Sequence, residues 1–180
     1  MRSVVVYESM YGNTHAIANE IARGLEPLGS VRLGTTEQVP MDAVDEADLV
    51  VVGGPTHVHG MSSAASRRAA AETAAADDEI DLDDNAGSPG LGEWFDMLLA
   101  DGRGRLGAAF DTRIDKPVLI TGSAAKGIGK RLRRHGFDLV TEPECFLVTG
   151  SEGPLVPGEL DRALRWGEKL AGLCHGRSSR

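Results

Sequence analysis

The sequence predicts an α/β fold in which helices cover both faces of a five-stranded parallel sheet. Short runs of β-branched residues alternate along the chain with amphipathic helical patterns, which is typical of strand–helix–strand units. The run Asp48–Val52 is apolar after its first residue, as in a strand that is buried on both faces. Because 41% of the 180 residues are hydrophobic and no internal repeat is present, residues 1–180 are expected to form a single domain.

Three strands are predicted in the first third of the chain. The expected elements are a strand at Ser3–Tyr7, a helix at Asn13–Leu25, a strand at Ser30–Leu33, one or two helical turns at Asp42–Ala47 and the strand Asp48–Val52. The helix is predicted because Ile17, Ile21 and Leu25 recur at helical spacing, and Pro27 and Gly29 stop it.

The last 90 residues are expected to contain two further strands. The predicted elements are a helix at Leu91–Leu99, a strand at Gly107–Phe110, a connection at Asp111–Gly122 that is first polar and then apolar, a helix from Ser123 to His135, a fifth strand within Leu139–Val148 and a helix at Glu159–Leu173. Ser123 is a suitable N-cap and Gly136 a suitable stop for the penultimate helix.

An Ala- and Asp-rich insertion separates these two parts at about residues 62–89. Ser62–Pro89 contains nine alanines and only two large apolar residues, Ile80 and Leu82. Its first half, Ser62–Ala76, favours a helix by propensity, whereas the acidic stretch Asp77–Asp84 is expected to be a solvated or disordered loop.

Composition and charge exclude several classes of protein. No apolar run approaches the ~20 residues that a membrane-spanning helix needs, and the N-terminus lacks the features of a signal peptide, so a cytoplasmic location without membrane insertion is expected. The net charge of −8 disfavours nucleic acid as a partner. Six of the 27 acidic residues lie in the stretch Asp77–Asp84 of the insertion, and without these six charges the formal net charge would be −2.

A candidate phosphate-binding loop follows the first strand directly. The residues Ser9, Met10, Tyr11, Gly12, Asn13 and Thr14 lead straight into a helix. Backbone N–H groups and the helix dipole favour an anion there, hydroxyl groups can donate to its oxygens, and Gly12 permits a close approach of the backbone. In a doubly wound sheet, a ligand binds at the carboxyl ends of the strands, where the strand order reverses between strands 1 and 3.

The motif Ser-Met-Tyr-Gly-Asn-Thr after a Val-rich strand resembles the FMN-phosphate loop of the flavodoxin-like family, and Gly53-Gly54-Pro55-Thr56 stands where that family has its second flavin loop. The resemblance implies a flavodoxin-like three-layer sandwich with strand order 2-1-3-4-5 and FMN as cofactor. By this resemblance, Ser9, Tyr11, Gly12, Asn13 and Thr14 bind the phosphate, with Met10 contributing its backbone. The implied ring neighbours are Pro55, Thr56, His57, Val58, His59 and Gly60, with Asp111, Thr112 and Arg113 as a third loop.

The second loop differs from that of electron-shuttle flavodoxins, which commonly place an aromatic pair around the flavin. His57 and His59 stand there instead. Histidines at this position can border the flavin or donate a proton, can ligate a metal only with further ligands, or can be ordinary surface residues. Trp94 and Tyr11 are the aromatic residues that could replace the missing pair.

The resemblance implies an FMN-binding redox protein that transfers electrons between a reductant and a partner protein or small acceptor. Two alternatives remain open at this point. One is an FMN-dependent NAD(P)H:quinone-type oxidoreductase, and the other is a non-catalytic module of the same fold whose flavin site has decayed.

Overall fold

The computed structural model describes residues 1–57, 60–76, 82–99 and 101–178. Its strands are β1 (Arg2–Tyr7), β2 (Ser30–Thr35), β3 (Leu49–Pro55), β4 (Leu106–Ile114), β5 (Asp138–Leu139) and β6 (Glu144–Val148). They form one parallel sheet in the order β2-β1-β3-β4-β5, and β6 also pairs with β4. The α/β class and the predicted strand order are therefore confirmed.

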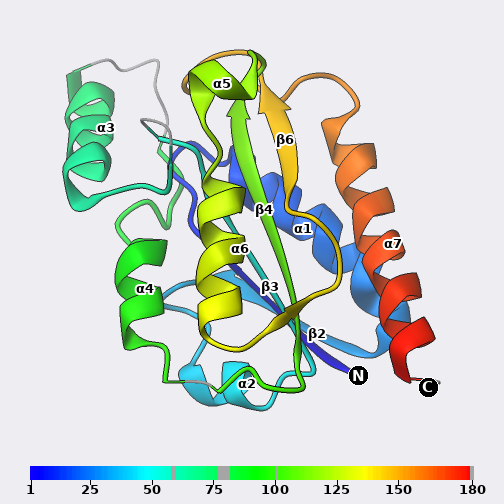
Figure 1. Cartoon of the computed structure of the whole chain (residues 1–180). Helices are drawn as coiled ribbons and strands as arrows, with labels where there is room; N and C mark the ends of the chain where they lie inside the picture. Colours follow the sequence, from blue (N-terminus) through cyan, green and yellow to red (C-terminus); the bar gives the residue numbers. More distant parts are fainter. Residues whose placement is uncertain (58–59, 77–81, 100, 179–180) are drawn as a thin grey trace.

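Helices cover both faces of this sheet (Figure 1). They are α1 (Asn13–Leu25), the 3-10 turn η1 (Glu26–Leu28), α2 (Met41–Asp45), α3 (Ala64–Ala76), α4 (Leu91–Met97), α5 (Val118–Thr121), α6 (Ala124–Arg134) and α7 (Glu159–Ser178). In the described part of the chain, no helix has the length and apolar character needed to cross a membrane.

The sheet separates two hydrophobic cores, because successive residues of a strand point to opposite faces. Val5 and Tyr7 of β1 pack with Ile17 and Ile21 of α1 and with residues of α7. Val4 and Val6 of the same strand pack on the other face with Trp94, Phe95 and Ile128, which belong to α4 and α6. Both faces of β1 are buried from Ser3 on, which explains why its residues from Val4 to Tyr7 are continuously apolar instead of alternating.

Glycines bring the backbones of α1 and α7 into close contact on the first face. A Cβ atom at Gly24 would lie 2.5 Å from the carbonyl oxygen of Leu164. In the reverse direction, a Cβ atom at Gly167 would lie 2.5 Å from the carbonyl oxygen of Ile21. The two helices therefore pack at a distance that only glycine permits at these two positions.

The predicted fifth strand is divided into two short strands on the same edge of β4. Leu106 and Gly107 pair with β5, and the segment from Phe110 to Ile114 pairs with β6. The four residues between β5 and β6 include Pro143, which has no N–H group to donate to a neighbouring strand. The division is thus consistent with the local sequence.

The fourth strand is longer than predicted, and this corrects the assignment of the third loop. Asp111, Thr112 and Arg113 belong to β4 and not to a loop after it. They are held in the sheet from both sides, since they pair with β6 and the first two also pair with Gly54 and Pro55 of β3. The sequence did not indicate that the strand continues, because the residues at its end are polar.

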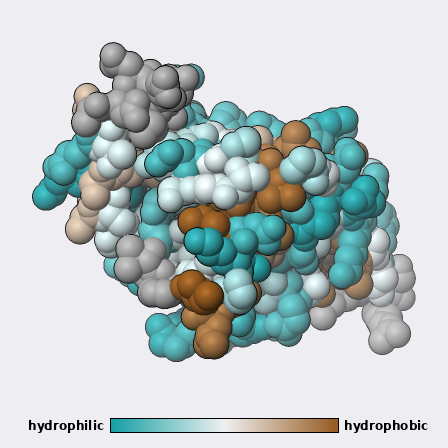
Figure 2. Space-filling model, turned by 90° about the horizontal axis from the view of Figure 1, so that it is seen from above, coloured by the Kyte–Doolittle hydropathy of each residue, from teal (hydrophilic) through white to brown (hydrophobic). Residues whose placement is uncertain are grey.

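The connection after β4 contains one short helix, α5, whose apolar side chains are exposed. Leu119 is 96% and Ile120 59% exposed. This helix lies at the end of the molecule to which β4 and β6 point (Figure 1). Seen from above, that end is mainly hydrophilic with separate apolar patches (Figure 2).

Candidate functional site

The loop between β1 and α1 presents unpaired backbone N–H groups. Gly12 is the N-cap of α1 and adopts a left-handed conformation with φ of 79°, and no side chain caps the helix. Within the part of the chain that the structure describes, the backbone N–H groups of residues 10–14 have no hydrogen-bond acceptor. Because these donors and the positive end of the helix dipole coincide, the loop is suited to bind an anion.

Two residues of the loop connect it to the other strand ends. The hydroxyl groups of Thr14 and Thr112 lie 2.7 Å apart and are buried, which joins α1 to β4. The side-chain amide of Asn13 donates to the carbonyl oxygen of Glu152 at 2.8 Å. The segment that follows β6 is thereby held against the start of α1.

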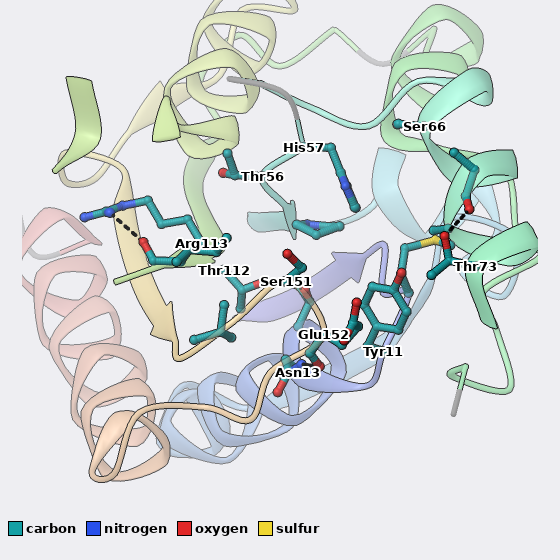
Figure 3. A pocket seen from close by; sticks show the side chains of 17 residues that line it. Tyr11, Asn13, Thr56, His57, Ser66, Thr73, Thr112, Arg113, Ser151 and Glu152 are labelled. Atoms are coloured by element: carbon teal, nitrogen blue, oxygen red, sulfur yellow. Dashed lines mark hydrogen bonds between the residues drawn. The ribbon is translucent and has the colours of Figure 1, made fainter. Parts of the chain in front are cut away.

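A cavity of about 430 Å³ extends from this loop over the carboxyl ends of β3 and β4 (Figure 3). It is lined by Met10, Tyr11, Asn13, Thr14, Pro55, Thr56, His57, Ser66, Ala69, Ala70, Thr73, Thr112, Arg113, Ile114, Val148, Ser151 and Glu152. Nine of the fifteen residues proposed from the sequence are in this lining. Its volume is in the range of roughly 300–1,000 Å³ that small-molecule and cofactor sites have.

The remaining six proposed residues are not in this lining. Ser9, Gly12 and Gly60 lie in the first two loops, and Asp111 lies in β4 behind the cavity wall. Val58 and His59 lie outside the described residues. Trp94, considered as a possible flavin neighbour, is fully buried in the core with α4 and α6 and does not line the cavity.

Two side chains of the cavity lining carry a buried nitrogen atom that has no hydrogen-bond partner among the described residues, namely Nε2 of His57 and Nε of Arg113. The guanidinium of Arg113 points away from the cavity, and its Nη1 atom donates to the carbonyl oxygens of Ile114 and Lys116 (Figure 3). Burial lowers the pKa of His57, although the nearby carboxylate of Glu8 acts in the opposite direction. A buried polar atom without a partner is costly, so Nε2 of His57 indicates a ligand with a polar group of its own.

Asp111 holds the floor of this site together. Its Oδ2 atom accepts hydrogen bonds from the Thr56 hydroxyl at 3.0 Å, the Ser123 hydroxyl at 2.8 Å and the backbone N–H of Ala125 at 2.9 Å. The side chain is fully buried. Through these bonds, one carboxylate fixes the end of β3 and the start of α6 relative to β4.

Sequence reasoning missed the wall that the insertion adds to the cavity. Ser66, Ala69, Ala70 and Thr73 of α3 line it. These residues occur at i, i+3, i+4 and i+7, so they share one face of the helix, and this spacing was a signal available in the sequence. Their small side chains let the helix approach the cavity closely.

Polar contacts hold α3 in this position. The guanidinium of Arg67 donates to both carboxylate oxygens of Glu93 in α4, at 2.8 and 2.7 Å. Arg67 also donates to the Ser62 hydroxyl, which in turn donates to the buried carboxylate of Glu8 at the end of β1. The second oxygen of Glu8 accepts from the backbone N–H of Leu91 at 2.9 Å. The start of the insertion and the start of α4, which follows the insertion, are thus held by the same carboxylate.

These features define a doubly wound α/β protein with a cavity, suited to a phosphate-bearing ligand, at the carboxyl ends of its strands. The family model for flavodoxin matches residues 5–94. The chain belongs to the flavodoxin family, whose members bind a flavin, typically FMN, and donate electrons to partner proteins.

Solved structures with the same fold are similar over nearly the whole chain. A flavodoxin from Archaea is 21% identical, with 96% of this chain and 97% of that chain covered and a TM-score of 0.65. Flavodoxin 1 from Bacillus cereus is 18% identical, with coverages of 96% and 98% and a TM-score of 0.66. The flavodiiron protein from Giardia intestinalis matches over 97% of this chain but only 36% of its own, at 19% identity and a TM-score of 0.61. A search of curated protein sequences gave no match.

Proposed function

We propose that this protein binds FMN in the described cavity and transfers electrons between a reductant and a partner protein or small acceptor. One observation carries the proposal: the cavity joins a loop of unpaired N–H groups at the start of α1 to the buried, unpartnered Nε2 atom of His57 just beyond β3. Such a site suits a ligand with a phosphate at one end and a polar ring system at the other.

Different residues would contact the phosphate and the ring of FMN. The N–H groups of residues 10–14 would bind the phosphate, and His57 would donate to a polar atom of the ring. The small side chains of α3 would cover the ring and exclude water from one side. FMN itself supplies the ability to take up and release one or two electrons.

Flavin binding is tested by titrating the protein, freed of bound ligand, with FMN and following the quenching of flavin fluorescence. We expect saturable binding by the native protein and a loss of at least about tenfold in affinity for Ala70→Trp, because Ala70 is almost fully buried and lines the cavity. An indole at this position must enter the cavity and compete with the ring.

The matched control is Ala71→Trp, the same substitution one residue further along α3. Ala71 is exposed and is not part of the cavity lining, so FMN affinity should remain unchanged. Equal affinities in both variants would place the flavin elsewhere. Native protein that quenches no flavin fluorescence would favour a non-catalytic module.

Electron transfer is tested on the FMN-loaded protein. For a carrier, we expect that protein reduced by dithionite passes electrons rapidly to a one-electron protein acceptor such as cytochrome c. We also expect that it does not consume NADPH and a quinone faster than free FMN does. Rapid turnover of NADPH and quinone would instead identify a two-electron oxidoreductase.

A further inference from the structure

The end of the insertion lies directly on the phosphate-binding loop. The backbone N–H of Asp83 donates to the carbonyl oxygen of Met10 at 2.8 Å. Shortly after it, the side chain of Asn85 accepts a hydrogen bond from Gln38 at 2.9 Å, beside the carboxyl end of β2. The chain from Asp83 to Asn85 is therefore fixed to loops that belong to the flavodoxin body.

The carboxylate of Asp83 is buried against this loop, although the acidic stretch was expected to be solvated. Its side chain is only 3% exposed, and its Oδ2 atom lies 3.1 Å from Nδ1 of His15. The same oxygen lies 4.0 Å from the place where a Cβ atom of Gly12 would be. Asp84, in contrast, is exposed, as the sequence predicted.

The contacts of Asp83 keep its carboxylate negatively charged. Burial alone would raise its pKa, but hydrogen bonds from the backbone and side chain of Asn85, together with His15 and Ser9, outweigh this effect and lower the pKa below its usual value. Tyr7, which stacks on His15, also senses this charge. Two effects raise the pKa of Tyr7 to about 12: its burial, which is the larger, and the negative charge of Asp83.

Ser9, in the same loop, is buried, and its hydroxyl oxygen accepts the backbone N–H of His15 at 3.4 Å. The carboxylate of Asp83 thus lies beside both Gly12 and His15, at the start of α1 where a phosphate would bind.

We propose that Asp83 determines how strongly this protein distinguishes flavins with a phosphate group from flavins without one. The inference rests on the proposed function, because it concerns a ligand of the same site. A phosphate monoester carries between −1.5 and −2 charges near neutral pH. A buried carboxylate beside the loop repels that charge, whereas it leaves the ring end of the cavity unaffected. The insertion thus lowers the preference for FMN over riboflavin.

A second acidic side chain lies near the loop but is expected to contribute less. Glu152 lines the cavity. The pKa of Tyr11 is raised mainly by the burial of that tyrosine and secondly by the negative charge of Glu152. Its side chain is exposed, so water and salt screen its charge much more than that of Asp83.

The test compares the dissociation constants of FMN and riboflavin for the native protein, Asp83→Asn and Asp84→Asn. Asparagine has the shape of aspartate, and both variants remove one negative charge. We expect Asp83→Asn to bind FMN about tenfold more tightly and riboflavin as tightly as the native protein. Asp84→Asn should leave both constants unchanged. Unchanged riboflavin binding also shows that the variant retains its fold.

Three results would overturn this proposal. They are an unchanged FMN constant in Asp83→Asn, an equal gain for FMN and riboflavin, and the same gain in Asp84→Asn. An alkaline absorbance titration supplies an independent readout, because the pKa of Tyr7 should fall from about 12 in Asp83→Asn if the carboxylate charge is placed as described. An unmoved tyrosine titration would also count against the proposal.

Failure of the proposed function is distinguishable from failure of this inference. If no variant binds either flavin, the flavin assignment is wrong, and inorganic phosphate becomes the probe. Phosphate should then raise the melting temperature of Asp83→Asn more than that of the native protein. Equal shifts, or none, would contradict the assigned role of Asp83.

Discussion

Gly24→Ala is expected to destabilise the protein by about 2–3 kcal/mol, and so to lower its melting temperature by roughly 5–10 °C. Alanine is normally the better helix former, by up to ~1 kcal/mol. Here its methyl group would meet backbone atoms of α7, the carbonyl oxygen of Leu164 at 2.5 Å and the nitrogen of Glu168 at 2.7 Å. Backbone atoms cannot rotate away like a side chain, so α1 and α7 must separate and open the core between them.

The control for this prediction is Gly172→Ala in α7. A Cβ atom at Gly172 would have no neighbour within 4 Å, so only helix propensity should act there. We expect a gain of up to ~1 kcal/mol, measured by thermal and urea unfolding. If both substitutions shifted stability in the same direction, the close packing of α1 on α7 would not be the cause.

Asp111→Ala is expected to cost about 3 kcal/mol, measured by urea unfolding. The substitution would leave the hydroxyls of Thr56 and Ser123 and the N–H of Ala125 without their buried acceptor. An unsatisfied buried polar group costs about 1–3 kcal/mol, and water cannot easily replace a fully buried carboxylate. FMN affinity should fall as well, because Thr56 lines the cavity.

Two further variants separate this role from a general effect of charge. Asp111→Asn keeps an acceptor oxygen of the same shape and should retain most of the stability. Asp115→Ala removes an exposed aspartate just beyond β4 and should change stability by less than about 0.5 kcal/mol. A loss in Asp115→Ala equal to that in Asp111→Ala would refute a specific role for the buried carboxylate.

Local patterns were sufficient to predict the elements around the first loop. The helix predicted at Asn13–Leu25 has the same bounds as α1, because apolar residues at helical spacing and a following Pro and Gly act within a few turns of chain. β1 and β3 were recognised from continuous apolar runs, since both their faces are buried. The predicted cap of α6 is also confirmed, with Ser123 accepting from the backbone N–H of Lys126.

Where pairing between distant strands decides the outcome, prediction from local sequence was less accurate. The polar end of β4 is a strand only because β3 and β6 flank it, so Asp111–Arg113 was predicted as a loop. The fifth strand was expected as one element, but its residues meet β4 at two separate places. Neither feature has a local signature, because the hydrogen-bond partners lie far away in sequence.

By itself, the sequence determined the order of strands and helices, the two buried faces of the sheet and the loop Ser9–Thr14, since hydrophobic periodicity, helix signals and turn residues are local properties. Only the tertiary structure decided what the insertion does. Its helix α3 forms a wall of the cavity, and its Asp83 lies buried on the phosphate-binding loop. The physical reason is that the environment of a side chain depends on the segments packed around it. Neighbouring acids in one short stretch, Asp83 and Asp84, can therefore be buried and exposed respectively.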